Sequence, residues 1–335
     1  MIAQRSLSFN LEPTFRCNLE CPMCPRFSSE DPHLDMTEET YDRIHAAMDY
    51  AHTVDFTGWG EPLMHRRIYE MVQMARDKGC LTTMTSNGTA LNERNIQRLL
   101  EAGLTRLVVS VDGMRPETYD PIRIGASFDK LTSNLKNLAG WIERTGSSLD
   151  FGIAFTIQEG NAGDLERIVP WMKGVGARTL HLKQLNVISN AGDWRQSFLK
   201  YRLRPLQENG GALSRLEDRI EKLRREADRE GLRFWMHSEA PLSSRKEPRH
   251  CLATPLHSAY FSYEGRVAPC CHFGHHVSRF FEGEFHPPSS LFFGDIRSQS
   301  FEDVWLSLPF VEFRRGFERK RFPEACRSCY LLYGK

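Results

Sequence analysis

Two groups of cysteines at opposite ends of the chain constrain its fold most strongly. Cys17, Cys21 and Cys24 form one group, and five more cysteines lie between Cys251 and Cys329. The first residues lack the apolar stretch of a secretory signal, so we expect a cytoplasmic protein whose thiols stay reduced. Clustered reduced thiols are typical metal ligands rather than disulfide partners. The sequence therefore predicts two metal sites.

Composition narrows the class of protein. The chain has 335 residues, of which 40% are apolar and 26% charged, a balance typical of globular domains. This length allows one large α/β domain and a smaller appended unit. The net charge of +1 gives no basic footprint for nucleic acid, and no apolar run is long enough to span a membrane.

Up to about residue 185, short apolar runs alternate with longer amphipathic segments. Repeated βα units of this kind build a parallel sheet. Six strands are too few to close an eight-stranded barrel, so we expect a partial (β/α)6 TIM-like barrel. The predicted strands are 6–11, 53–57, 81–85, 106–111, 150–156 and 179–185, and the predicted helices are 37–51, 67–78, 93–101, 128–145 and 163–175.

The rest of the chain divides into two parts. Residues 186–248 contain a highly charged amphipathic helix, 214–230, and a polar, proline-containing stretch, so we interpret them as a helical bridge and linker after the 1–185 core. Residues 249–335 are rich in Phe, His, Pro and Cys and show few helical patterns. A small region of this kind often needs a metal to order it.

The first cysteine group directly follows the first predicted strand, with the spacing C-x3-C-x2-C. Three thiolates on one tight loop can bind three corners of a [4Fe–4S] cluster and leave one iron open. A structural zinc site would need four ligands. The carboxyl end of a barrel strand is also where α/β barrels carry out their chemistry.

This loop resembles the signature of the radical S-adenosylmethionine (SAM) superfamily. The resemblance implies that the open iron binds SAM and that reductive cleavage of SAM yields a radical that abstracts hydrogen from substrate. The family usually has an aromatic residue before the last cysteine, where this chain has Met23. Methionine is polarizable enough to pack against an adenine.

Three further segments strengthen the resemblance, because each follows a successive predicted strand. Gly58-Trp59-Gly60-Glu61-Pro62 resembles the family motif that binds the SAM amino group, and the other two resemble its ribose- and carboxylate-binding edges. The resemblance covers about residues 6–185. The SAM-binding residues that it implies are Gly58, Gly60, Glu61, Pro62, Thr85, Asn87, Ser110, Asp112 and Arg123.

The second cysteine group surrounds a predicted hairpin turn at Glu264-Gly265 and ends in a C-x2-C pair. Spacing alone leaves a structural four-cysteine zinc site open. The region resembles the SPASM or twitch extension of the family. Since no cysteine follows Cys329, we expect the shorter twitch form with one auxiliary [4Fe–4S] cluster. The implied ligands are Cys251, Cys270, Cys326 and Cys329.

Cys271 has two interpretations. It is either a packed thiol beside the ligand Cys270 or a catalytic thiol that returns a hydrogen atom to a substrate radical. The spacing does not decide whether Cys270 or Cys271 binds the auxiliary cluster.

The resemblance predicts a radical SAM oxidoreductase that uses a flavodoxin- or ferredoxin-type electron donor. The expected reaction is the two-electron dehydrogenation of a small alcohol or sugar-like molecule in secondary metabolism. One alternative is a peptide (RiPP) maturase that forms crosslinks or epimers, which the short segment before Cys17 disfavours. The others are an epimerase with a cysteine hydrogen donor and, outside enzymes, a zinc-stapled binding module.

Overall fold

The computed structural model describes residues 2–185, 188–198, 211–236, 251–281 and 283–333. One sheet of ten strands forms the centre, and a separate hairpin pairs β10 (Val277–Phe281) with β11 (Glu284–Ser289). In chain order the strands of the large sheet are β1 (Leu7–Leu11), β2 (Ala51–Asp55), β3 (Leu81–Ser86), β4 (Arg106–Ser110), β5 (Asp150–Ile157), β6 (Thr179–Gln184), β7 (Arg233–Met236), β8 (Ser258–Phe261), β9 (Arg266–Ala268) and β12 (Gly294–Asp295).

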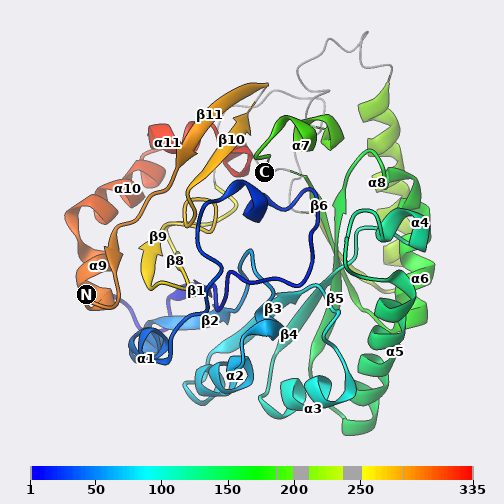
Figure 1. Cartoon of the computed structure of the whole chain (residues 1–335), viewed down its shortest axis with the longest axis horizontal. Helices are drawn as coiled ribbons and strands as arrows, with labels where there is room; N and C mark the ends of the chain where they lie inside the picture. Colours follow the sequence, from blue (N-terminus) through cyan, green and yellow to red (C-terminus); the bar gives the residue numbers. More distant parts are fainter. Residues whose placement is uncertain (1, 186–187, 199–210, 237–250, 282, 334–335) are drawn as a thin grey trace.

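Helices cover the outside of the curved sheet (Figure 1). In chain order the helices of the described residues are α1 (Glu38–Ala46), α2 (Ile68–Asp77), α3 (Glu93–Glu101), α4 (Pro116–Tyr119), α5 (Phe128–Thr145), α6 (Ile168–Val175), α7 (Ala191–Gln196), α8 (Ala212–Arg229), α9 (Phe301–Leu306), α10 (Leu308–Glu318) and α11 (Glu324–Arg327). Of these, α7 and α11 lie near the β10–β11 hairpin instead of over the sheet.

The partial barrel expected from the sequence is confirmed. Strands β1 to β6 are parallel neighbours in chain order, and β7 and β8 add one further parallel strand at each edge. β7 and β8 do not pair, so the barrel stays open. Strand β7 lies inside 186–248, where we expected only a helix and a linker, because four residues are too short to stand out as a periodic pattern.

Local hydrogen bonds explain where two predicted elements differ from the structure. β2 ends at Asp55, two residues early, because the Thr57 hydroxyl donates to Asp55 Oδ1 at 2.6 Å and accepts the N–H of Thr85 at 2.9 Å. α6 begins five residues late, after a 3₁₀ segment. There the Asn161 side chain binds the backbone of Thr156 and Gln158, and such local bonds compete with a helix.

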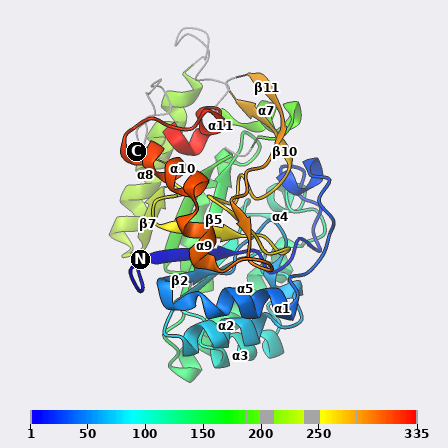
Figure 2. The ribbon, with the colours of Figure 1, turned by 90° about the vertical axis from the view of Figure 1, so that its left-hand side faces the viewer.

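The C-terminal region continues the barrel sheet instead of forming a separate body. β8 pairs with β1, and β9 follows β8 as an antiparallel hairpin through Gly265, whose φ is 89°. Figure 2 shows α9 next to the blue strand near the N-terminus, which is β1. Phe301 of α9 packs edge-on against Phe9 of β1 with ring centroids 4.9 Å apart, so aromatic contacts attach α9 to the barrel sheet.

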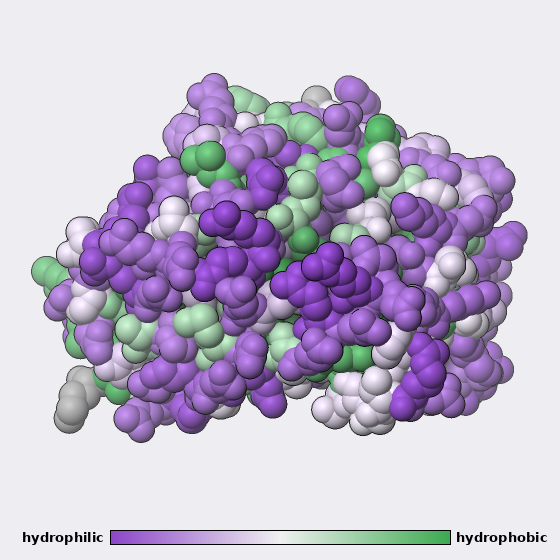
Figure 3. Space-filling model, turned by 60° about the horizontal axis from the view of Figure 1, so that its bottom comes forward, coloured by the Kyte–Doolittle hydropathy of each residue, from purple (hydrophilic) through white to green (hydrophobic). Residues whose placement is uncertain are grey.

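The face of the molecule in Figure 3 is mainly polar. Hydrophilic residues dominate the face at the bottom of Figure 1, and apolar residues lie there in small separate groups (Figure 3). In the described part of the chain, no helix has the length and apolar character that crossing a membrane requires.

The aromatic contact between α9 and β1 yields a stability prediction. Phe301 is 1% exposed, whereas Leu308 in the adjacent helix is 71% exposed. We expect Phe301→Ala to lower the free energy of unfolding by about 3 to 5 kcal/mol, because it leaves a cavity in a packed core. Leu308→Ala is the control and should change it by less than about 0.5 kcal/mol. Denaturant titration measures both, and equal effects would contradict the packing described.

Candidate active site

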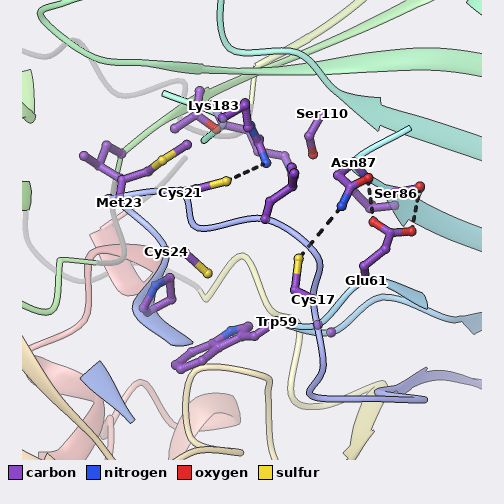
Figure 4. A pocket seen from close by; sticks show the side chains of 18 of the residues that line it. Cys17, Cys21, Met23, Cys24, Trp59, Glu61, Ser86, Asn87, Ser110 and Lys183 are labelled. Carbon is purple, nitrogen blue, oxygen red and sulfur yellow. Dashed lines mark hydrogen bonds between the residues drawn. The ribbon is translucent and has the colours of Figure 1, made fainter. Parts of the chain in front are cut away.

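A cavity of about 400 Å³ opens at the carboxyl ends of the barrel strands. Its wall contains residues of the first cysteine loop, residues that follow β2 to β6, and His272 and Leu331 of the C-terminal region. Figure 4 shows the labelled side chains around this space. The cavity is therefore shared between the barrel and the region that carries the second cysteine group.

Cys17, Cys21 and Cys24 all line the cavity, and they are the only cysteines among the described residues that do. Burial raises the pKa of all three thiols, that of Cys21 to about 11, although the Arg123 guanidinium opposes the rise at Cys21. Such thiols stay protonated until a metal displaces their protons. Three thiols on one loop fit a cluster with one open iron.

Glu61 contributes a buried carboxylate to the cavity wall. Its Oε1 accepts from Ser86 Oγ at 2.8 Å and from the N–H of Leu63 at 3.1 Å, and its Oε2 accepts from the N–H of Asn87 at 2.6 Å. Burial raises the pKa of this carboxyl, and these hydrogen bonds oppose the rise. A carboxylate has about four acceptor positions, so one remains for a cationic group such as an amine.

Two glycines of the same loop are required by the protein's own packing. A Cβ atom on Gly60 would lie 2.2 Å from the carbonyl oxygen of Thr14, and one on Gly58 would lie 2.3 Å from Cγ of Glu12. Both glycines also line the cavity. Their absence of side chains therefore brings this loop against the end of β1, beside the cysteine loop.

The other residues expected to bind SAM divide into two groups. Thr85, Asn87, Ser110 and Arg123 line the cavity, whereas Pro62 and Asp112 do not. Asp112 is fully buried behind the wall and forms an ion pair with Arg123. Arg123 in turn lies with Nη1 3.9 Å from Sγ of Cys21. Asp112 thus acts on the cavity through Arg123.

Asn87 also contacts the cysteine loop. Its side-chain amide donates to Asn18 Oδ1 at 2.9 Å and lies 3.8 Å from Sγ of Cys17 (Figure 4). The end of β3 is thereby connected to the first residues of the loop.

The second cysteine group gathers around Cys270. Burial raises the pKa of the Cys270 thiol well above its usual value, and the nearby thiols Cys271, Cys329, Cys251 and Cys326 raise it further. The four predicted ligands are therefore neighbours, although they come from positions up to 78 residues apart (251 to 329). In the described part of the chain, no three side chains of His, Cys, Asp or Glu are close enough to bind one metal ion together.

Cys271 has different surroundings from Cys270. Burial raises the pKa of its thiol to about 12, and the carboxylates of Glu12 and Asp55 contribute next, before any other cysteine. Cys271 is not among the cavity-lining residues. Two carboxylates are therefore the main charged groups that act on the Cys271 thiol, whereas thiols are those that act on Cys270.

Sequence reasoning missed Lys183, which lines the cavity from the end of β6. A signal was available, because His181 and Lys183 alternate with Leu180 and Leu182. In a barrel whose outer face is covered by helices, polar residues at every second position indicate the inner face.

Sequence reasoning also missed a buried ionic contact at His275. Its Nε2 lies 3.1 Å from Oε2 of Glu12, and its Nδ1 lies 2.9 Å from Oδ2 of Asp31. Burial alone would lower the pKa of this imidazole, but the two carboxylates outweigh it and raise the pKa to about 9. The ring also stacks on Trp59 with centroids 4.2 Å apart. A protonated His275 therefore joins the C-terminal region to β1 and to the first cysteine loop.

Comparisons with known proteins agree with this geometry. A family model of the radical SAM superfamily matches residues 11–151, and a model of an iron–sulfur cluster-binding domain, SPASM, matches residues 251–330. A tungsten-containing aldehyde ferredoxin oxidoreductase cofactor-modifying protein of Pyrococcus furiosus is 24% identical over 96% of this chain and 86% of its own length.

Two further similarities extend over nearly the whole chain. A PqqA peptide cyclase of Granulibacter bethesdensis is 25% identical over 95% of this chain and 78% of its own length. The crystal structure of Streptococcus suis SuiB bound to precursor peptide SuiA superposes with a TM-score of 0.68 at 16% identity, over 99% of this chain and 71% of that one. At that identity the likeness supports the fold alone.

The His275 contact predicts a specific pH dependence. Because the folded-state pKa is raised to about 9 from 6.5, its stabilisation is complete below pH 6.5 and is lost as the pH rises through about 9. We expect His275→Gln to cost about 3 kcal/mol at pH 6, since it leaves buried carboxylates without their counter-ion, and much less at pH 9.5. Unfolding midpoints of both proteins across this range measure it. A pH-independent difference would contradict a charged His275.

Proposed function

Since the chain belongs to the radical SAM superfamily and carries a C-terminal SPASM domain, we propose that it oxidises a substrate by two electrons in the cavity between its two cysteine groups. One observation carries this proposal. The cavity that Cys17, Cys21 and Cys24 line is also lined by His272 and Leu331, which adjoin the second cysteine group in sequence. A substrate bound there lies between the two iron–sulfur sites.

The two cofactor sites have separate ligands. We assign the first cluster to Cys17, Cys21 and Cys24, and the auxiliary cluster to Cys251, Cys270, Cys326 and Cys329. When bound, SAM on the first cluster supplies a radical that removes a hydrogen atom from carbon, and the auxiliary cluster accepts an electron.

The residues beside the first cluster would orient SAM. The free acceptor position of Glu61 suits the amino group of SAM, and Arg123, held by Asp112, presents a guanidinium beside Cys21 that suits its carboxylate. An external donor of the flavodoxin or ferredoxin type would deliver the first electron.

The cavity suits a small polar substrate. Beyond the SAM-binding residues, its wall presents the side chains of Thr156, Lys183, Gln184 and His272. A few polar groups in a partly apolar cavity are the usual means of orienting a small molecule. Dehydrogenation of an alcohol or sugar-like molecule is therefore our first assignment of the reaction.

Peptide modification is the second candidate function. A PqqA peptide cyclase is similar to this chain over 95% of its length, which favours a peptide substrate. Incubation with small alcohols and with peptides, each deuterated at carbon, followed by mass spectrometry, separates the candidates. The substrate class that transfers deuterium to 5′-deoxyadenosine is the one on which the enzyme acts. For that substrate, loss of two hydrogens marks a dehydrogenation or a crosslink, whereas an unchanged hydrogen count with one hydrogen gained from solvent marks an epimerisation.

The assignment of the first cluster predicts the behaviour of one triple variant. Cys17, Cys21 and Cys24, all changed to Ala, should abolish reductive formation of 5′-deoxyadenosine and leave about four of about eight irons per chain, because the second group is intact. Anaerobic iron and sulfide analysis with chromatography of SAM products checks this. Continued formation of 5′-deoxyadenosine would exclude these three cysteines as ligands of the first cluster. Zinc without iron in the wild type would exclude both iron–sulfur clusters and with them the proposed function.

The different surroundings of Cys270 and Cys271 predict unequal effects of the same substitution. Cys270→Ala should lower the iron content by about half, since it removes a ligand of the auxiliary cluster. Cys271→Ala serves as its matched control and should keep the iron content of the wild type. If Cys271→Ala loses the iron instead, the ligand set is Cys251, Cys271, Cys326 and Cys329.

A further inference from the structure

Lys183 is a partly buried cation on the inner face of the barrel. It sits near the end of β6 and lines the cavity together with Gln184 and Thr156. In the described part of the chain, the Lys183 ammonium makes neither a hydrogen bond nor an ion pair with a protein group. Buried charges in proteins are normally paired, so an unpaired ammonium facing a cavity indicates that the partner is a ligand.

The nearest charged groups do not fill this role. Four of them surround Lys183: Asp55, Asp112, Cys271 and Arg123. Asp55 accepts a hydrogen bond from the Thr57 hydroxyl at 2.6 Å and does not line the cavity, and Asp112 is paired with Arg123. Burial lowers the pKa of Lys183 and Asp55 opposes this, so an incoming anion would favour the charged form.

The other charges in the cavity wall already have partners. The Glu61 carboxylate accepts three hydrogen bonds from the protein, and the Arg123 guanidinium is paired with Asp112 beside Cys21. Lys183 comes instead from β6. Thr156 of β5 lies between β6 and Ser110 at the end of β4. It is therefore a second cationic position, separate from the arginine beside the first cysteine group.

We propose that Lys183 binds a carboxylate group of the substrate. The substrate is then an acidic molecule, such as a hydroxy acid, an acidic sugar or an acidic side chain of a peptide. The folded protein already shields the ammonium in part from bulk water, so a carboxylate that replaces water there gains a charge-assisted hydrogen bond with part of the desolvation cost already met. This inference rests on the proposed position of the substrate, and it specifies the substrate's chemistry for either candidate reaction.

Trifluoroacetate is a suitable probe, because it is a carboxylate small enough for the cavity and is visible by ¹⁹F NMR. The titration uses the anaerobically reconstituted enzyme saturated with SAM, so that the SAM site is filled. Trifluoroacetamide, which has nearly the same shape and no charge, is the control ligand. We expect saturable binding of trifluoroacetate and at least about tenfold weaker binding of the amide.

Four variants test whether Lys183 is responsible. Lys183→Met and Lys183→Gln should each weaken trifluoroacetate binding by about tenfold or more, and Lys183→Arg should retain it within about threefold. Lys222→Met, the same change of charge on the exposed face of α8, should leave binding unchanged. Iron content and the dissociation constant of SAM, measured for each variant, show that the fold and the first cluster are intact.

Two results would overturn the inference. The first is the absence of saturable trifluoroacetate binding to the wild type, or equal binding by Lys183→Met. The second is a tenfold loss of SAM affinity in Lys183→Met, which would assign Lys183 to the SAM carboxylate. Failure of the proposed function is distinguishable, since it would show as no SAM cleavage or no substrate oxidation while the Lys183-dependent binding of the probe persists.

Discussion

The parallel pairing of β8 with β1 is the interaction on which the rest of the structure depends. Ser258 to Phe261 lie opposite Ser8 to Leu11, so a strand from the end of the chain is hydrogen-bonded beside the first one. Cys17, Cys21 and Cys24 follow β1, whereas Cys270 and Cys271 follow β9, which returns antiparallel beside β8. The pairing of β8 with β1 therefore attaches the region of the second cysteine group directly to the strand that precedes the first group. His272 and Leu331 of this region line the same cavity as the first group.

Buried polar contacts then fix how the two regions meet. Glu12 directly follows β1, and its carboxylate accepts from the Tyr260 hydroxyl at 2.7 Å and from the N–H of Trp59 at 2.6 Å, while it also faces His275. One carboxylate thus contacts β8, the glycine-rich loop and the C-terminal region. Buried ionic groups contribute little net stability, but they tolerate few alternative arrangements, so this network favours one position of the second cysteine group over the cavity.

The charged groups in the cavity wall differ in whether the protein itself already pairs them. Thiols line one side, and Glu61 and Arg123 are held beside them by Ser86, Asn87 and Asp112. These groups are oriented by the protein before any ligand binds, which is how a site lowers the cost of ordering its cofactor. Lys183 differs because no group among the described residues pairs with it. The cavity therefore has one side whose charged groups are already oriented by the protein, and another side where Lys183 is available to bind a ligand.

The sequence by itself determined the elements whose signals are local. The C-x3-C-x2-C spacing, the order of six βα units and the loops after successive strands are readable from neighbouring residues, and α3 and α5 lie where the pattern predicts them. Since the carboxyl ends of parallel strands meet, even the gathering of Glu61, Asn87, Ser110 and Arg123 follows from strand order. Strand β7 was not predicted, because four residues show no period of their own, and the pairing of β8 with β1 was not predicted either.

Only the tertiary structure decided the contacts between residues that are distant in the chain. Cys270 and Cys271 are adjacent in sequence, yet one lies among thiols and the other beside Glu12 and Asp55. The charge of His275 depends on carboxylates more than 240 residues away. Lys183 shares its cavity with residues as distant in the chain as Cys17 and Leu331. Burial and pairing are properties of the folded surroundings, and for this reason the spacing of residues along the chain does not contain them.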